Sequence, residues 1–241
     1  MSLNTSLAKF LNKIKFVLFF ISLLIIFFSI LFFVNEFFLV KNIQLVSNQK
    51  FSLSNKEKLI NKNILFINKD QTAKKIIRDN FQINTVVVEK VWPNSLRISV
   101  SFYEPCVSLI VSSGFFNLSC DGRILQKNKD IPQYLPVINY YQKLNSGFFQ
   151  TGDWIDFKDI KQVLFFINKL KEVNLTALTI DIKGQDMLVF NLIDSQQIIF
   201  STSKNNGVQN YQLEVLIKQF KIEGKKFKKI DLRFDKPIIS F

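Results

Sequence analysis

The chain has 241 residues, a net charge of +13 and no histidine. The missing histidine excludes serine–histidine catalytic triads and histidine metal ligands, and it removes the commonest general base. The two cysteines, Cys106 and Cys120, are too few to build a four-ligand zinc site by themselves.

An uncharged run of nineteen residues lies near the N-terminus, from Phe16 to Val34. At about 1.5 Å per residue, a helix of this length matches the ~30 Å hydrocarbon core of a bilayer. Cleaved signal peptides usually have apolar regions of about 7–15 residues followed by small residues, which are missing after Val34. The run therefore predicts an uncleaved transmembrane helix, placed at residues 16–38.

The charges that flank this run predict its orientation. Three lysines and no acidic residue precede the run: Lys9, Lys13 and Lys15. After the run, the opposite charges of Glu36 and Lys41 cancel each other. Positive residues near a first span favour the cytoplasmic side. We therefore expect residues 1–15 to form a cytoplasmic tail in the cytoplasmic (inner) membrane, with the bulk of the chain outside the cytoplasm.

Residues 39–104 have the pattern of a compact domain with the element order β-α-α-β-β. Strands alternate apolar and polar side chains, whereas a helix gathers its apolar residues on one face, as Ala73, Ile76 and Ile77 do. The expected elements are strands at 40–46, 85–91 and 96–103 and helices at 52–62, with Ser54 as a cap, and at 70–80. Trp92-Pro93-Asn94-Ser95 joins the last two strands, because proline suits a turn.

The pattern of residues 105–241 predicts an antiparallel sheet domain with helices on one face, so the expected overall fold class is α+β. Turns are expected at Ser113-Gly114 and Asp121-Gly122. The expected elements are a helix at 156–172, strands at 178–182, 188–193 and 198–201, a helix at 209–222 that ends before Gly224, and a last strand at 229–234.

Three segments, together with the order of elements, resemble the bacterial cell-division family FtsQ, called DivIB in Gram-positive bacteria. Residues 86–98 resemble the strand, Trp-Pro turn and Leu-x-Ile strand of its POTRA domain. Leu135-Pro136-Val137-Ile138 resembles a Leu-Pro-hydrophobic segment, and residues 230–235 resemble a C-terminal strand of the form (V/I)DLR(Y/F). Phe102 departs from the family, which often has glutamate there.

The resemblance implies a single-pass scaffold of the division septum rather than an enzyme. Such proteins bind FtsB-like and FtsL-like partners, and through them help control the septal peptidoglycan synthase FtsW/FtsI. An edge strand offers unpaired backbone groups to which a partner segment can add. We expect the last strand to be that edge, with the partner-binding residues Ile230, Asp231, Leu232, Arg233, Phe234 and Asp235.

Two other functions are compatible with an exported, basic chain. Asp153, Asp156 and Asp159 form the nearest carboxylate cluster for a cell-wall hydrolase, although their positions suit the start of a helix better. The first forty residues carry +2, which leaves +11 on the rest and allows binding to an anionic surface.

The state of the two cysteines depends on the length of the first hairpin loop. A two-residue Ser113-Gly114 loop places Cys106 and Cys120 on opposite faces, whereas a three-residue loop places them opposite each other, where a disulfide is possible. We favour two buried thiols. No cofactor is expected.

Overall fold

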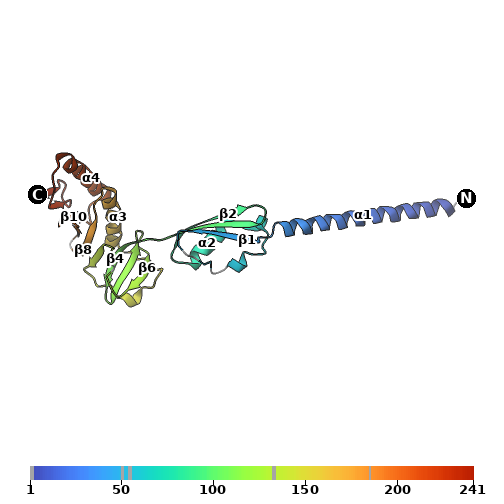
Figure 1. Cartoon of the computed structure of the whole chain (residues 1–241), viewed down its shortest axis with the longest axis horizontal. Coiled ribbons are helices and arrows are strands. Elements are labelled where there is room, and N and C mark those ends of the chain that lie inside the picture. Colours follow the sequence, from blue (N-terminus) through green and yellow to red (C-terminus); the bar gives the residue numbers. More distant parts are fainter. Residues whose placement is uncertain (1–2, 50–51, 54–55, 132–133, 185) are drawn as a thin grey trace. The chain divides into compact units, whose positions relative to one another are not determined.

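The computed structural model describes residues 3–49, 52–53, 56–131, 134–184 and 186–241. The chain forms two compact units, residues 1–101 and 102–241 (Figure 1). The first unit holds an N-terminal helix and a three-stranded sheet, and the second holds a nine-stranded sheet with helices. The fold is therefore α+β, as expected.

The N-terminal helix α1 (Leu3–Phe37) is a candidate membrane span or signal sequence. Its segment Leu18–Phe37 is long and apolar enough to cross a bilayer. The described apolar side chains of this segment are exposed, with none packed into a protein core. Such a helix is stable only when another apolar phase covers it.

The three-stranded sheet of the first unit has the order β1-β3-β2. Its elements are β1 (Asn42–Ser47), β2 (Ile83–Val91), β3 (Ser95–Phe102) and the helix α2 (Lys69–Asp79). β1 runs parallel to β3, and Ile76 of α2 is buried, as the periodicity predicts. Asn68 caps α2, because its side chain accepts a hydrogen bond from the Gln71 amide at 3.1 Å.

The helix expected at 52–62 is wrong. Among its described residues, this range holds one short 3-10 turn, η1 (Lys56–Lys58), and a second one, η2 (Ile64–Phe66), follows it. Ser54 lies outside the described residues. Asn61 adopts a left-handed φ of 61°. Its amide donates to the Val40 carbonyl at 3.0 Å, so it cannot join a helical ladder.

The second unit is built on one sheet of nine strands, in the order β12-β11-β10-β9-β8-β7-β4-β5-β6. The strands are β4 (Pro105–Val111), β5 (Gly114–Ser119), β6 (Ile124–Asn128), β7 (Val137–Tyr140), β8 (Ala177–Lys183), β9 (Met187–Leu192), β10 (Gln197–Ser201), β11 (Lys229–Asp231) and β12 (Ile238–Ser240). The helices are η3 (Ser146–Phe148), α3 (Lys158–Glu172) and α4 (Asn206–Glu223).

The sheet is mixed rather than antiparallel, which corrects the prediction. The pairs β4–β7, β7–β8 and β10–β11 are parallel. For β7–β8 and β10–β11 the physical reason is the position of the helices, because α3 joins β7 to β8 and α4 joins β10 to β11. A helical crossover returns the chain in the same direction and so makes the two strands parallel.

The helices share one core with the sheet. α3 buries the face that the periodicity predicts, including Ile160, Val163 and Leu170. Its Phe166 ring stacks on Phe200 of β10, with centroids 3.8 Å apart. α4 ends as predicted at Gly224, which takes a left-handed φ of 64°. Alternate residues of β9 and β10 belong to this core, so the helices cover one face of the sheet.

Cys106 and Cys120 form a disulfide, so the prediction of two thiols is wrong. The hairpin turn consists of Ser112 and Ser113, and Val111 pairs with Gly114. A register shift between Pro105 and Val107 then brings Cys106 to within 5.0 Å of Cys120, measured between Cα atoms. The disulfide suggests that this part of the chain lies outside the cytoplasm.

Candidate partner-binding edge

The predicted edge strand is shorter than expected and does not form the edge. β11 ends at Asp231 and lies between β10 and β12, so the C-terminal edge of the sheet is β12. β11 is antiparallel to β12, with Ile230 opposite Ile239. The chain leaves β11 through a turn that contains Leu232, Arg233 and Phe234.

Asp231 and Arg233 form a two-point ion pair at the start of this turn. The Arg233 Nε donates to Asp231 Oδ1 at 2.9 Å and its Nη2 donates to Oδ2 at 2.7 Å. The Arg233 amide also donates to Asp231 Oδ1, at 3.2 Å. The guanidinium of Arg233, one of the predicted partner-binding residues, is therefore engaged within its own chain.

Burial and pairing act on the Asp231 carboxyl in opposite directions. Burial raises its pKa, but the hydrogen bonds and the charge of Arg233 outweigh burial, so the pKa of Asp231 lies below its ordinary value. The hydrogen bonds to Asp231 in turn raise the pKa of Arg233. The pair is therefore charged, and it holds the turn closed.

Lys204, which precedes α4, and Gln212 of α4 hold the other side of the turn. The Lys204 Nζ donates to the Leu232 carbonyl at 3.2 Å and to the Phe234 carbonyl at 2.6 Å. The Gln212 Nε2 donates to the Asp235 carbonyl at 2.8 Å. Leu232 is fully buried, whereas Phe234 projects outward with 48% of its surface exposed. The turn therefore presents Phe234 on a fixed backbone.

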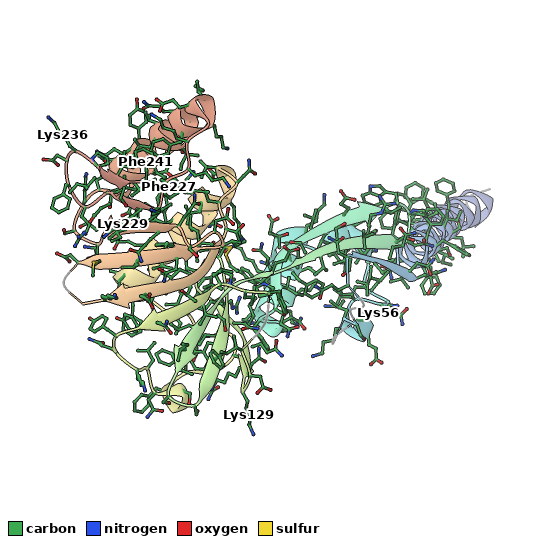
Figure 2. The ribbon with its side chains drawn as sticks, turned by 60° about the vertical axis from the view of Figure 1, so that its left-hand side comes forward. Lys56, Lys129, Phe227, Lys229, Lys236 and Phe241 are labelled. Carbon is green, nitrogen blue, oxygen red and sulfur yellow. A yellow bond between two sulfur atoms is a disulfide. The ribbon has the colours of Figure 1, made fainter. Side chains whose placement is uncertain are left out.

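Exposed apolar side chains extend along this end of the sheet. Ile238 on β12 and the terminal Phe241 are both more than half exposed. The Phe241 ring packs edge-on against Phe220 of α4. Figure 2 labels Phe241 at this end of the second unit. The outer face of α4 adds further exposed apolar residues: Val208, Tyr211, Val215 and Ile222. We name Phe234, Ile238 and Phe241 together with β12 the C-terminal edge.

The opposite edge of the sheet, β6, is covered. The Ile124 amide donates to the Asp153 carbonyl, and the Gly152 amide donates to the Ile124 carbonyl, both at 2.8 Å. Lys127 also reaches over this edge to the carbonyls of Ser146 and Phe149. Over the described ranges, no segment pairs with the outer side of β12. The C-terminal edge is therefore the more open of the two.

The three aspartates of the hydrolase alternative each serve local structure. Asp156 pairs with Lys161, and Asp153 accepts from the Gln150 amide at 2.6 Å. Asp159 accepts from the Tyr140 hydroxyl at 3.4 Å. None of them caps α3, because the N-cap position is Phe157 and has no side-chain cap. Among the residues that the structure describes, no group of three potential metal ligands occurs.

No family model matches the chain, and a search of curated proteins returns no similar sequence. Of the six predicted site residues, the structure brings Asp231 and Arg233 together, buries Ile230 and Leu232, and exposes Phe234 and Asp235. Sequence reasoning missed Ile238 and Phe241. The signal was present, because Pro237 breaks the last strand and β-branched residues follow it.

Proposed function

We propose that this chain is a membrane-anchored scaffold of the cell-division machinery, of the FtsQ/DivIB type, and not an enzyme. Its role is to bind FtsB-like and FtsL-like single-pass proteins at the septum, and through them to help control FtsW/FtsI. Three features support this proposal: the apolar N-terminal helix, the two β-rich units, the second of which carries a disulfide, and the motif at residues 230–235.

One observation carries the proposal, namely that the nine-stranded sheet ends in an open strand. A partner segment that pairs with β12 would gain main-chain hydrogen bonds, which give affinity independently of sequence. The exposed aromatic rings of Phe234 and Phe241 supply the side-chain anchors that dominate binding energy at interfaces. The opposite edge is less available for strand addition, because residues 152–155 and Lys127 cover it.

The turn explains why Phe234 is a suitable anchor. An aromatic side chain on a preorganised backbone binds without a large entropic cost for ordering the loop. Lys204, Gln212 and the Asp231–Arg233 pair hold that backbone before any partner arrives. Arg233 thus serves as a positioning residue, and its guanidinium lies 5.5 Å from the Phe234 ring centroid.

Phe234→Ala tests this function in the full chain, reconstituted with a purified FtsB-like partner. Truncation of a hot-spot aromatic costs about 2 kcal/mol or more, which weakens affinity at least about tenfold. Calorimetric titration measures the affinity, and the thermal unfolding midpoint reports the fold. We expect weaker binding at an unchanged midpoint.

The matched control is Phe148→Ala, which removes an exposed phenylalanine beside the opposite edge. We expect this variant to bind the partner as the parent chain does. If Phe148→Ala weakens binding and Phe234→Ala does not, the partner docks at β6 and the assignment of the C-terminal edge is wrong.

A further inference from the structure

The first unit carries exposed aromatic side chains where its chain leaves α1. Phe66 is 85% exposed and Trp92 is 55% exposed, although both belong to a folded domain with its own core. Leu65, next to Phe66, is exposed as well. Large apolar side chains gathered in this way mark a surface that is covered by something else.

A backbone hydrogen bond and a ring contact hold the segments that carry these side chains close to the residues that follow α1. The Ile64 amide at the start of η2 donates to the Phe38 carbonyl at 2.8 Å. The Phe38 ring lies edge-on to Trp92, with centroids 5.8 Å apart. Phe38 is the first residue after the candidate span, so η2, which carries Phe66, and the Trp92 ring both lie next to the point at which the chain leaves the span.

The turn between β2 and β3 is tied to the same point. The Lys41 amide donates to the Asn94 carbonyl at 2.8 Å, and the Lys90 Nζ donates to the Leu65 carbonyl at 3.1 Å. These bonds join η2, the turn and the segment after α1 into one surface. We name it the juxtamembrane face: Leu65, Phe66 and Trp92, with Lys41, Lys62 and Lys90.

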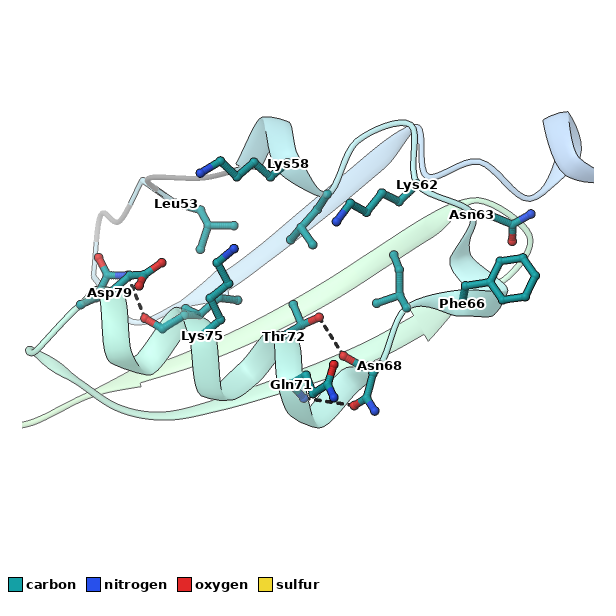
Figure 3. A pocket seen from close by; sticks show the side chains of 14 residues that line it. Leu53, Lys58, Lys62, Asn63, Phe66, Asn68, Gln71, Thr72, Lys75 and Asp79 are labelled. Atoms are coloured by element: carbon teal, nitrogen blue, oxygen red, sulfur yellow. Dashed lines mark hydrogen bonds between the residues drawn. The ribbon is translucent and has the colours of Figure 1, made fainter.

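A lysine-rimmed cavity adjoins this face. It has a volume of about 420 Å³, and its walls come from α2 and the two 3-10 turns. Phe66 and Lys62 lie toward one end and Asp79 toward the other (Figure 3). Lys58 and Lys75 line the cavity as well, so its basic residues outnumber its acid.

We propose that the juxtamembrane face lies in the headgroup region of the outer leaflet and prefers anionic phospholipids. Tryptophan and phenylalanine concentrate at membrane interfaces, and lysines beside them attract anionic headgroups. The bilayer is the occupant because η2 and the turn between β2 and β3, which carry these rings, are held against Phe38, the first residue after the candidate span. The inference rests on the uncleaved anchor of the proposed function.

The test places a single indole on the face of the full chain. Phe66→Trp is made in a background of Trp92→Phe and Trp154→Phe, and the protein is reconstituted in nanodiscs of phosphatidylcholine with phosphatidylglycerol. Brominated acyl chains report contact with lipid, and iodide reports contact with water. We expect blue-shifted emission, strong quenching by brominated lipid and little quenching by iodide.

Val87→Trp in the same background is the matched control. Val87 is exposed on β2 of the same unit and lies outside the juxtamembrane face. We expect the control indole to be quenched by iodide, and quenched by brominated lipid at least about twofold less than the indole at position 66. Equal lipid quenching at the two positions overturns the inference.

Two further measurements keep the outcomes distinct. The intact mass of the reconstituted chain shows whether α1 is retained. Loss of α1 overturns both the uncleaved anchor and this inference. If α1 is retained and the indole at position 66 is exposed to water, this inference alone is overturned. If the triple variant does not fold, Phe66→Ser together with Trp154→Phe should lower the lipid quenching of Trp92. Unchanged quenching of Trp92 would overturn the inference.

Discussion

At the scale of single residues, the segment 230–235 has a different role from the one its alternation predicts. A strand would place Asp231 and Arg233 on an outer, charged face, available to a partner. Instead the two side chains close on each other across one intervening residue and end the strand. A short-range ion pair of this kind cannot be told from an alternating strand by periodicity, because both place charges two residues apart.

The depressed pKa of Asp231 predicts a pH dependence of stability. A carboxyl whose pKa is lower in the folded state than its unfolded value of about 3.9 stabilises the fold above that value. This stabilisation is lost as the pH falls through the folded pKa. Acidification from neutral pH to below about 4 should therefore destabilise the parent chain more than Asp231→Asn, in urea unfolding followed by circular dichroism. Equal losses would contradict the assigned ion pair.

At the scale of elements, sequence patterns located most helices and strands but not how the strands pair. α3 has a clear helical period, and Ile160, Val163 and Leu170, which share one face in that period, are buried against the core. The parallel pairs were not predicted, because pairing depends on where α3 and α4 return the chain. The helix expected at 52–62 failed because tertiary hydrogen bonds to Val40 override local propensity.

The candidate site likewise has features that the sequence predicts and features that it does not. Burial of Ile230 and Leu232 follows from their apolar character. The position of the edge does not, because it depends on three residues after Pro237 that fold back onto β11. The disulfide could not be predicted from the sequence pattern either, because a register shift within β4 decides whether Cys106 faces Cys120.

The disulfide links the two strands of the first hairpin in the second unit, and its removal should lower the free energy of unfolding. Cys106 and Cys120 are separated by 14 positions, and a closed loop of about this length is worth about 3 kcal/mol of unfolding free energy. Replacing both cysteines by serine should lower the free energy of urea unfolding by that amount. The parent chain in excess reductant should behave like the variant. A parent chain that does not respond to reductant would contradict the disulfide.

At the scale of the whole molecule, the two units offer two kinds of surface. The juxtamembrane face of the first unit carries aromatic rings beside lysines, which suits a lipid headgroup layer. The C-terminal edge of the second unit presents an open strand with exposed rings, which suits an added peptide strand. A scaffold that holds single-pass partners needs both an anchor and a docking strand, and this chain has a candidate for each.

The central claim is that a division partner adds to β12. Photo-crosslinking in dividing cells tests it most directly, with a benzophenone amino acid placed at Phe241 in one strain and at Phe148 in another. We predict an adduct from position 241 that peptide mass mapping identifies as an FtsB-like or FtsL-like protein, and none from position 148. An adduct with such a protein from position 148 alone would contradict docking at the C-terminal edge.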